Sequence, residues 1–196
     1  MTQTDLFRLP VGRQSLDALY SRPKPPQQEA GSHPIKPLRP KRATLSGPDR
    51  VQEPPPLVIM IHDLPFGTMR DHEDLFGRID TLSVDLGFHG LRFDFRGCGS
   101  SAPPPGGLPT LGSASQDLGA AFDWGKAQGY RKFILVAEGL SASLALPRMT
   151  EDSVLAAILL WPVLDPKALA LEKFGAIAEM DAPAPDAILE AHGKKI

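Results

Sequence analysis

The sequence predicts an α/β fold, a three-layer sandwich built around a mostly parallel sheet. Four short apolar runs follow one another between positions 56 and 160, and each has the length of a strand buried on both faces. Segments with helical spacing of apolar residues separate them, and strands that alternate with helices pair in parallel through right-handed crossovers. The 196 residues, 42% of them hydrophobic, are enough for one buried core.

The four apolar runs are the expected central strands. They are PLVIMIH (56–62), GLRFDF (90–95), KFILVA (132–137) and VLAAILL (154–160). Upstream, FRLPV (7–11) and SLDALYSRP (15–23) predict a hairpin at one edge of the sheet, so residues 1–21 are assigned to edge strands and residues 57–165 to the core domain.

Two helices are expected between these strands. In residues 72–87 the apolar positions fall on one helical face, namely Leu75, Phe76, Ile79, Leu82 and Leu86. Residues 113–129 begin with a capping-box pattern, Ser113 and Gln116, and end at Gly129, a typical helix stop. Residues 166–196 predict one further helix and a tail interrupted by prolines.

Residues 22–56 form a basic, proline-rich arm. Eleven of the 21 prolines lie in residues 1–56, and residues 22–50 carry seven Lys or Arg against two Asp or Glu. With so few apolar side chains, this arm is expected to be extended rather than packed. It is either a solvated insertion or a segment that becomes ordered on a partner protein.

Composition and cysteine content exclude several classes of function. A formal net charge of −2 argues against general nucleic-acid or membrane-surface binding. The one cysteine, Cys98, cannot form an internal disulfide or a multi-thiolate metal site, which favours a reducing compartment and hence the cytoplasm. We find no export signal and no apolar segment long enough for membrane insertion. No cofactor or metal is expected.

Four stretches together resemble the α/β-hydrolase superfamily, most closely a small bacterial group of hydrolases without a large lid. LDALYSRP (16–23) is similar to the second strand of that family, and IHDLPFGTM (61–69) to the loop after its third strand. GLRFDFRGCGSSAPP (90–104) is similar to the fourth strand with its following loop, and AFDWGKAQ (121–128) to the helix before the nucleophile strand. The resemblance covers residues 5–22 and 57–165, and RFDFRGCGSS together with FGTM is its most specific part.

The resemblance implies a serine on a strained G-x-S-x-G turn, an acid, a histidine and two backbone N–H groups for the oxyanion. The family pattern, aligned with ILVAEGLSASLAL (134–146), places Gly139 at the nucleophile position. A positive φ there costs a serine about 1–3 kcal/mol and a glycine almost nothing. The resemblance therefore implies a turn that is kept without its nucleophile.

A second register makes Ser141 the nucleophile, with His62 as its base. It slides the motif by two residues and requires the strand to run through Glu138, where a charge at the end of a buried strand is unfavourable. In the first register, Ser141 and Ser143 are small residues that let the helix approach the sheet.

The other parts of the machinery are also altered. Asp165 and His192 are the nominal acid and base, and neither stands in the expected context. The oxyanion loop reads HDLP (62–65), so Asp63 brings a carboxylate to a place where negative charge develops. His62 is expected to bond the loop backbone, and Cys98 has no His or Lys nearby in the sequence to make its thiol reactive.

The leading hypothesis is a catalytically inactive α/β-hydrolase-like protein that acts as a structural or accessory subunit of a protein complex. A fold truncated after its sixth strand would expose an edge strand and helix faces to a protein partner, and the arm would suit wrapping over that partner. The alternative is a serine ester or thioester hydrolase that uses Ser141. A third possibility is a degraded gene product without function.

Overall fold

A computed structural model describes residues 2–24, 53–64, 67–69, 75–107, 109–165 and 167–168, and the backbone of residues 190–191 and 194–195. The elements in chain order are β1 (Thr2–Val11), β2 (Gln14–Pro23), β3 (Leu57–Ile61), α1 (Leu75–Asp85), β4 (His89–Phe93), α2 (Leu111–Ala127), β5 (Phe133–Glu138), the short 3₁₀ helix η1 (Gly139–Ser141), α3 (Ala142–Ala145), the 3₁₀ helix η2 (Leu146–Thr150), β6 (Val154–Leu160), β7 (Glu190–Ala191) and β8 (Lys194–Lys195).

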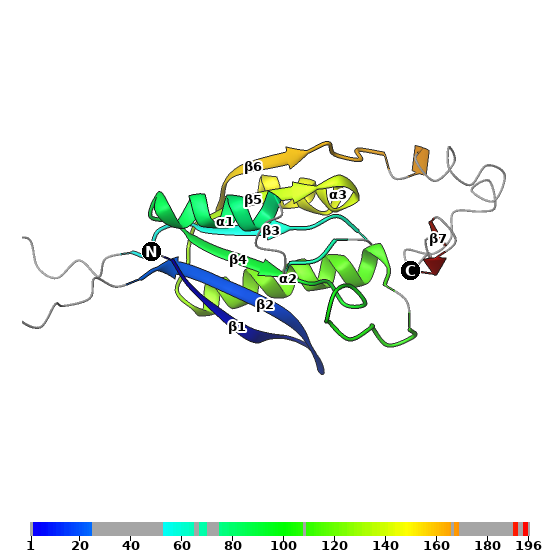
Figure 1. Ribbon diagram of the computed structural model, residues 1–196. Helices are drawn as coiled ribbons and strands as arrows, with labels where there is room; N and C mark the ends of the chain where they lie inside the picture. Colours follow the sequence, from blue (N-terminus) through cyan, green and yellow to red (C-terminus); the bar gives the residue numbers. More distant parts are fainter. Residues whose placement is uncertain are drawn as a thin grey trace, which may run out of the picture.

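A six-stranded sheet with the order β1-β2-β4-β3-β5-β6 forms the centre of the molecule (Figure 1). The strands β4, β3, β5 and β6 are parallel, whereas β1 and β2 form an antiparallel hairpin at one edge. The edge hairpin is confirmed, and so are β3, β4 and β5 as central strands. The run 154–160 does form the parallel strand β6, but its predicted central position is wrong, because β6 is the last strand of the described sheet. Strand β4 begins at His89 and ends at Phe93, earlier than the expected run, because Asp94 and Phe95 already belong to the loop.

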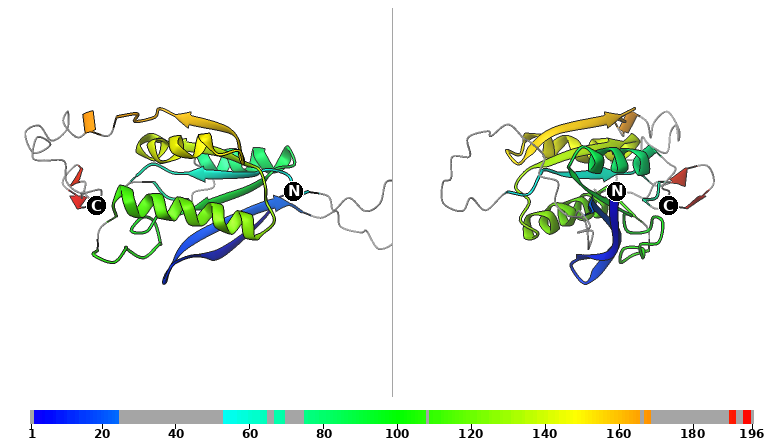
Figure 2. Two further views of the ribbon diagram at one scale, coloured as in Figure 1. Left: turned by 180° about the vertical axis from the view of Figure 1, so that it is seen from behind. Right: turned by 60° about the vertical axis from the view of Figure 1, so that its left-hand side comes forward.

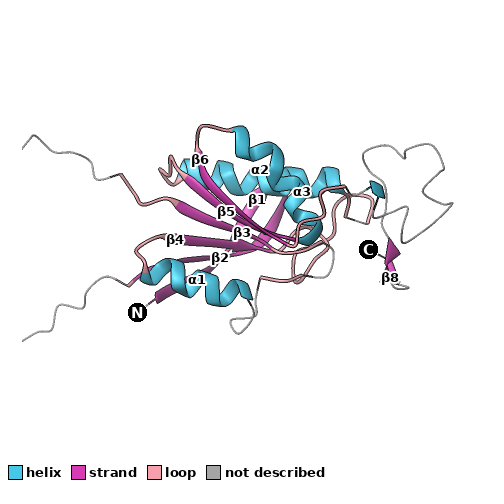
Figure 3. Cartoon of the chain, turned by 90° about the horizontal axis from the view of Figure 1, so that it is seen from above, coloured by secondary structure: helices cyan, strands magenta, loops and turns pink. Residues whose placement is uncertain are grey.

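The helices cover both faces of this sheet, which confirms the three-layer architecture. Helix α1 lies on one face, and α2 and α3 lie on the other (Figure 3). The larger apolar core fills the space beneath α2 and α3, and a smaller one lies beneath α1 around Val58, Met60, Phe76 and Val136. The hairpin β1–β2 twists away from the parallel strands and packs against α2 (Figure 2).

The predicted buried face of α1 is confirmed at Phe76, which is buried, and at Ile79, which packs against the smaller core, but it is wrong for the leucines. Leu82 and Leu86 are 59% and 68% exposed, and the residues that face the sheet are Phe76, Gly77, Asp80 and Val84. The helix is turned because Asp80 forms a buried ion pair with Arg92 of β4. A carboxylate that pairs with a buried guanidinium takes the inner face, and Leu82 and Leu86, on the opposite side, are left in solvent.

Helix α2 begins earlier than its predicted cap. Thr110 is the N-cap residue: its hydroxyl accepts the N–H of Ser113, and the Ser113 hydroxyl accepts the N–H of Thr110. Ser113 is therefore the third residue of the helix rather than the cap. The predicted stop at Gly129 is confirmed, with a φ of 92° that favours glycine after a helix.

Most of the arm and of the C-terminal segment lies outside the described residues. Strand β2 continues through Arg22 and Pro23, which the sequence assigned to the arm. In the C-terminal segment, the described backbone includes the antiparallel pair β7–β8. Within the part of the chain that is described, no helix is both long and apolar enough to cross a lipid bilayer.

Candidate functional site

The turn after β5 has the geometry of a nucleophile elbow. Strand β5 ends at Glu138, Gly139 follows with a φ of 56°, and helical residues begin directly after it. A strand, a turn with positive φ and a helix in direct succession form the arrangement that presents a serine in active hydrolases. The structure places Gly139 at this position, as the first register required. The strand does run through Glu138, so our objection to the second register on that ground was wrong.

Ser141 lies two residues further along, inside the helical turn. Its backbone has a φ of −66°, an ordinary helical value, and its side chain is fully buried. Among the described residues its hydroxyl has no hydrogen-bond partner. The hydroxyl of the neighbouring Ser143 donates to the carbonyl of Leu140, at 2.7 Å. The structure thus places no serine at the point of the turn itself.

The carboxylate of Asp63 occupies the space in front of the turn. Its Oδ1 accepts the backbone N–H of Leu140 at 2.7 Å. The residue after the nucleophile and a residue of the loop after β3 are the two that supply oxyanion donors in α/β hydrolases. Burial has the largest effect on the pKa of Asp63 and raises it. The backbone N–H groups, Leu140 first among them, lower this pKa less strongly, and the charge of Glu138 raises it.

Gly139 and Asp63 share one small space. A Cβ atom on Gly139 would overlap with the carboxylate of Asp63. The glycine therefore has two causes in this structure: its positive φ, and the absence of room for any side chain. Two of the residues that depart from the family pattern at this site therefore lie next to each other.

His62 uses both ring nitrogens within its own loops. Nδ1 lies 2.9 Å from the carbonyl of Asp63, and Nε2 accepts the N–H of Phe95 at 3.3 Å. These contacts assign the proton to Nδ1. Gly67 packs so closely on the ring that a Cβ there would overlap with it. His62 thus bonds the loop backbone, as the sequence predicted for a structural histidine.

The two most specific motifs of the sequence bind each other. Asp94 of RFDF is fully buried, and its Oδ1 accepts the N–H of Met69, the last residue of FGTM, at 2.7 Å. Arg92 of the same motif donates from Nη1 to the carbonyl of Met69 at 2.9 Å. These side chains fix the loop that carries Asp63. Sequence reasoning missed both roles, although the charges within an apolar strand were a signal for buried ion pairs.

The remaining candidates are not brought to this site by the described contacts. Asp165 is exposed and accepts the N–H of Ala168 at 2.9 Å, and His192 lies outside the described residues. Cys98 is buried, and burial raises the pKa of its thiol to about 12. In the described ranges no three His, Cys, Asp or Glu side chains are grouped as ligands for a metal ion.

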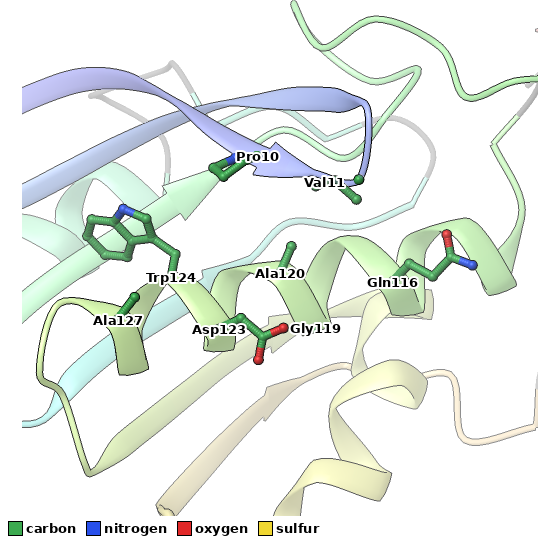
Figure 4. A pocket seen from close by; sticks show the side chains of 9 residues that line it. Pro10, Val11, Gln116, Gly119, Ala120, Asp123, Trp124 and Ala127 are labelled. Carbon is green, nitrogen blue, oxygen red and sulfur yellow. The ribbon is translucent and has the colours of Figure 1, made fainter.

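A shallow groove of about 500 Å³ lies elsewhere, between the β1–β2 turn and α2 (Figure 4). Its lining is mostly apolar and includes Trp124, which stacks on Phe7 with ring centroids 4.9 Å apart. Asp123 and Gln116 are its polar side chains, and none of the residues around the elbow lines it. The groove therefore does not belong to the candidate active-site region.

Solved structures of α/β hydrolases have the same fold. The esterase Est1E from Butyrivibrio proteoclasticus with bound ferulic acid matches with a TM-score of 0.62 and 20% identity over 97% of this chain and 66% of its own. An α/β serine hydrolase homologue from Coxiella burnetii gives 0.58 and 18% over 86% and 68%, and a Pyrococcus furiosus esterase 0.59 and 14% over 88% and 55%.

These likenesses confirm the α/β-hydrolase fold expected from the resemblance. No protein-family model matches the chain, and no curated protein matches it either. The chain spans between about half and two thirds of the length of the hydrolases that it matches.

Proposed function

We propose that this protein is a catalytically inactive member of the α/β-hydrolase fold that acts as an accessory or structural subunit in the cytoplasm. The observation that carries the proposal is the contact between Asp63 and the turn at Gly139. The nucleophile position lacks a hydroxyl, and the N–H of Leu140, a donor that would hold an oxyanion, already holds a carboxylate.

Electrostatics supports inactivity independently of the missing serine. Acyl transfer develops negative charge on the substrate oxygen, and removing a single oxyanion donor costs about 10²–10³ in rate. Here the carboxylate of Asp63 occupies the Leu140 donor and would repel the negative charge of an oxyanion. If the hydroxyl of another residue attacked a substrate here, the resulting tetrahedral intermediate would therefore still lack stabilisation.

Exposed apolar side chains on and after β6 support a protein partner. Residues 154–164 carry no charge, and Leu155, Ile158, Trp161 and Leu164 are each more than half exposed. In the described part of the chain, β6 pairs only with β5, so its outer edge is open. Open edges and apolar patches of this kind are typical of association sites.

Trp161 strengthens this proposal. It has a φ of 35°, which is unusual for a bulky side chain, and it is 67% exposed. Strained backbone persists where function requires it, and tryptophan is enriched among the residues that dominate binding energy. We therefore assign the partner-binding role to the surface formed by Leu155, Ile158, Trp161 and Leu164, named here the β6 surface.

Two measurements test the proposal. A fluorophosphonate probe should leave the folded protein unlabelled, and labelling at Ser141 that is lost in Ser141→Ala would favour the hydrolase alternative. Co-purification from the native source should yield a stoichiometric partner. Ile158→Glu should release that partner, whereas Leu82→Glu, at an exposed leucine on α1, should retain it. Retention by both variants would exclude the β6 surface.

A further inference from the structure

The groove between the β1–β2 turn and α2, called here the α2 groove, combines an aromatic ring with a carboxylate. Trp124 lines it and contacts two rings of the hairpin, stacking on Phe7 and meeting Tyr20 edge to face with ring centroids 5.4 Å apart. Asp123, the next residue back along α2, is exposed and pairs with no cation of the described residues (Figure 4). The α2 groove therefore suits an apolar segment that carries positive charge.

The basic arm contains a segment with this chemistry. Residues 34–42 read PIKPLRPKR, with a proline at 34, 37 and 40 and a cation at 36, 39 and 42. In a polyproline II helix, which has three residues per turn, the prolines form one edge and the cations a second. Grooves lined with aromatic side chains recognise such helices. The segment thus matches the α2 groove in shape class and in charge.

The lengths of the groove and of the segment also agree. The residues of α2 that line the groove run from Gln116 to Ala127, which is about 16 Å at 1.5 Å per residue. From Pro34 to Pro40 a polyproline II helix spans about 19 Å at 3.1 Å per residue. One such segment would therefore cover the groove from end to end.

Both ends of the arm leave the body of the protein close to the groove. On one side Tyr20, which contacts Trp124, is three strand residues from the end of β2 at Pro23, about 10 Å away. On the other side Glu53 pairs with Arg131, which lies shortly after the end of α2, at 3.7 Å. The ten residues that follow Lys24 extend to about 33–36 Å, so residues 34–42 can reach the groove of their own chain.

We propose that residues 34–42 dock in the α2 groove of the same chain, with their prolines against Trp124 and their cations toward Asp123. A segment tethered at both ends has an effective concentration of about millimolar, so a contact too weak for separate molecules is sufficient. The inference is independent of the proposed function, because neither the turn at Gly139 nor the β6 surface takes part in it.

Two triple variants test whether the spacing of the cations matters. The reporter is the indole N–H signal of Trp124 in NMR spectra, which Trp161→Phe distinguishes from the other tryptophan signal. Removing the cationic edge with Lys36→Gln, Arg39→Gln and Arg42→Gln should shift this signal. The matched control loses three cations outside that edge, by Lys24→Gln, Lys41→Gln and Arg50→Gln, and should not. Equal shifts in both variants, or no shift in either, would overturn the proposal.

A nitroxide label on Thr44→Cys tests where the segment lies. Cys98 is buried, so the reagent selects the new thiol. The indole signal of Trp124 should lose most of its intensity, and that of Trp161 should keep it, because the hairpin and β6 lie at opposite edges of the sheet. Undiminished intensity at Trp124 would contradict docking.

Charge reversal and mixing complete the test. Asp123→Lys in the nitroxide-labelled chain should restore the Trp124 signal, whereas Asp85→Lys, at an exposed carboxylate on α1, should not. Equal restoration by both variants would assign the effect to overall charge and overturn the proposal. Nitroxide-labelled chains mixed with isotope-labelled chains that lack the nitroxide should leave the Trp124 signal of the latter unchanged. Its loss would place the arm on a second copy and overturn docking within one chain.

Discussion

Gly12 and Gly139 have almost the same backbone conformation, with φ values of 57° and 56°, but opposite surroundings. A Cβ on Gly12 meets no atom within 4 Å, whereas a Cβ on Gly139 overlaps with the carboxylate of Asp63. The two glycines therefore separate the cost of a positive φ from the cost of crowding.

Gly12→Ser should lower the free energy of unfolding by about 1–3 kcal/mol, the usual cost of the left-handed region. Gly139→Ser should lose about 1–3 kcal/mol more, because it also crowds a packed site. Urea unfolding of both variants measures the difference, and equal losses would show that Asp63 moves aside without cost.

Gly139→Ser should also hydrolyse p-nitrophenyl acetate no faster than background. Turnover that His62→Ala abolishes would reveal a surviving base.

Crowding between positions 63 and 139 predicts that their substitutions are not additive. Adding Asp63→Ala to Gly139→Ser removes the group that the serine meets. The double variant should therefore lose less stability than the sum of the two single variants, by about 0.5–3 kcal/mol. A double-mutant cycle in urea gives this coupling directly. Additive losses would mean that the two side chains do not compete for the same space.

The buried ion pair between Arg92 and Asp80 should be far more sensitive than an exposed one. Asp80→Asn leaves the guanidinium of Arg92 in the core, and should cost about 3–5 kcal/mol of unfolding free energy. The matched control is Asp5→Asn, which breaks an exposed pair with Arg22 at 3.5 Å and should cost about 0–1 kcal/mol. Similar losses in the two variants would show that water reaches Asp80.

His89 should make the protein less stable in mildly acidic solution. Burial, assisted by the charge of Arg22, lowers the pKa of this imidazole, whose Nδ1 lies 3.0 Å from the hydroxyl of Tyr20. The unfolded chain, with a histidine pKa of about 6.5, then binds more protons than the folded chain below that pH. The stabilising contribution is present above about pH 6.5 and is lost as the pH falls through the folded value.

The comparison with His89→Gln isolates this effect. Urea unfolding between pH 7.5 and 5.5 should show a decline in the wild type that the variant lacks. The raised pKa values of Asp63 and Asp117 act in the opposite direction and are common to both proteins. Parallel curves for the two proteins would assign the decline to other groups.

Cys98 should not react in the folded protein. Its thiol is buried, and with a pKa of about 12 almost none of it is thiolate at pH 8. A thiol-specific disulfide reagent should therefore modify one group per chain in guanidinium and none in buffer. Fast modification without denaturant would show that the loop around Gly97 and Gly99 opens readily.

The sequence alone determined which segments form the parallel strands, but not their order in the sheet. The run LVIMI (57–61) is buried along its whole length, as expected for a strand between two layers of helix. VLAAILL (154–160) does not follow this expectation: Leu155 and Ile158 are more than half exposed, because β6 lies at the edge of the described sheet. Gly139 was equally accessible to sequence reasoning, because glycine after an apolar run followed by a helix indicates a turn with positive φ.

Only the tertiary structure decided which groups meet. The face of α1 depends on Arg92, twelve positions after Asp80, and no periodicity within the helix contains that partner. The occupation of the turn at Gly139 depends on a hydrogen bond from Leu140 to Asp63, 77 positions away. Asp63 and Leu140 meet because the parallel neighbours β3 and β5 bring their carboxyl ends to one edge of the sheet. What this edge binds is therefore set by side chains that only the fold places together.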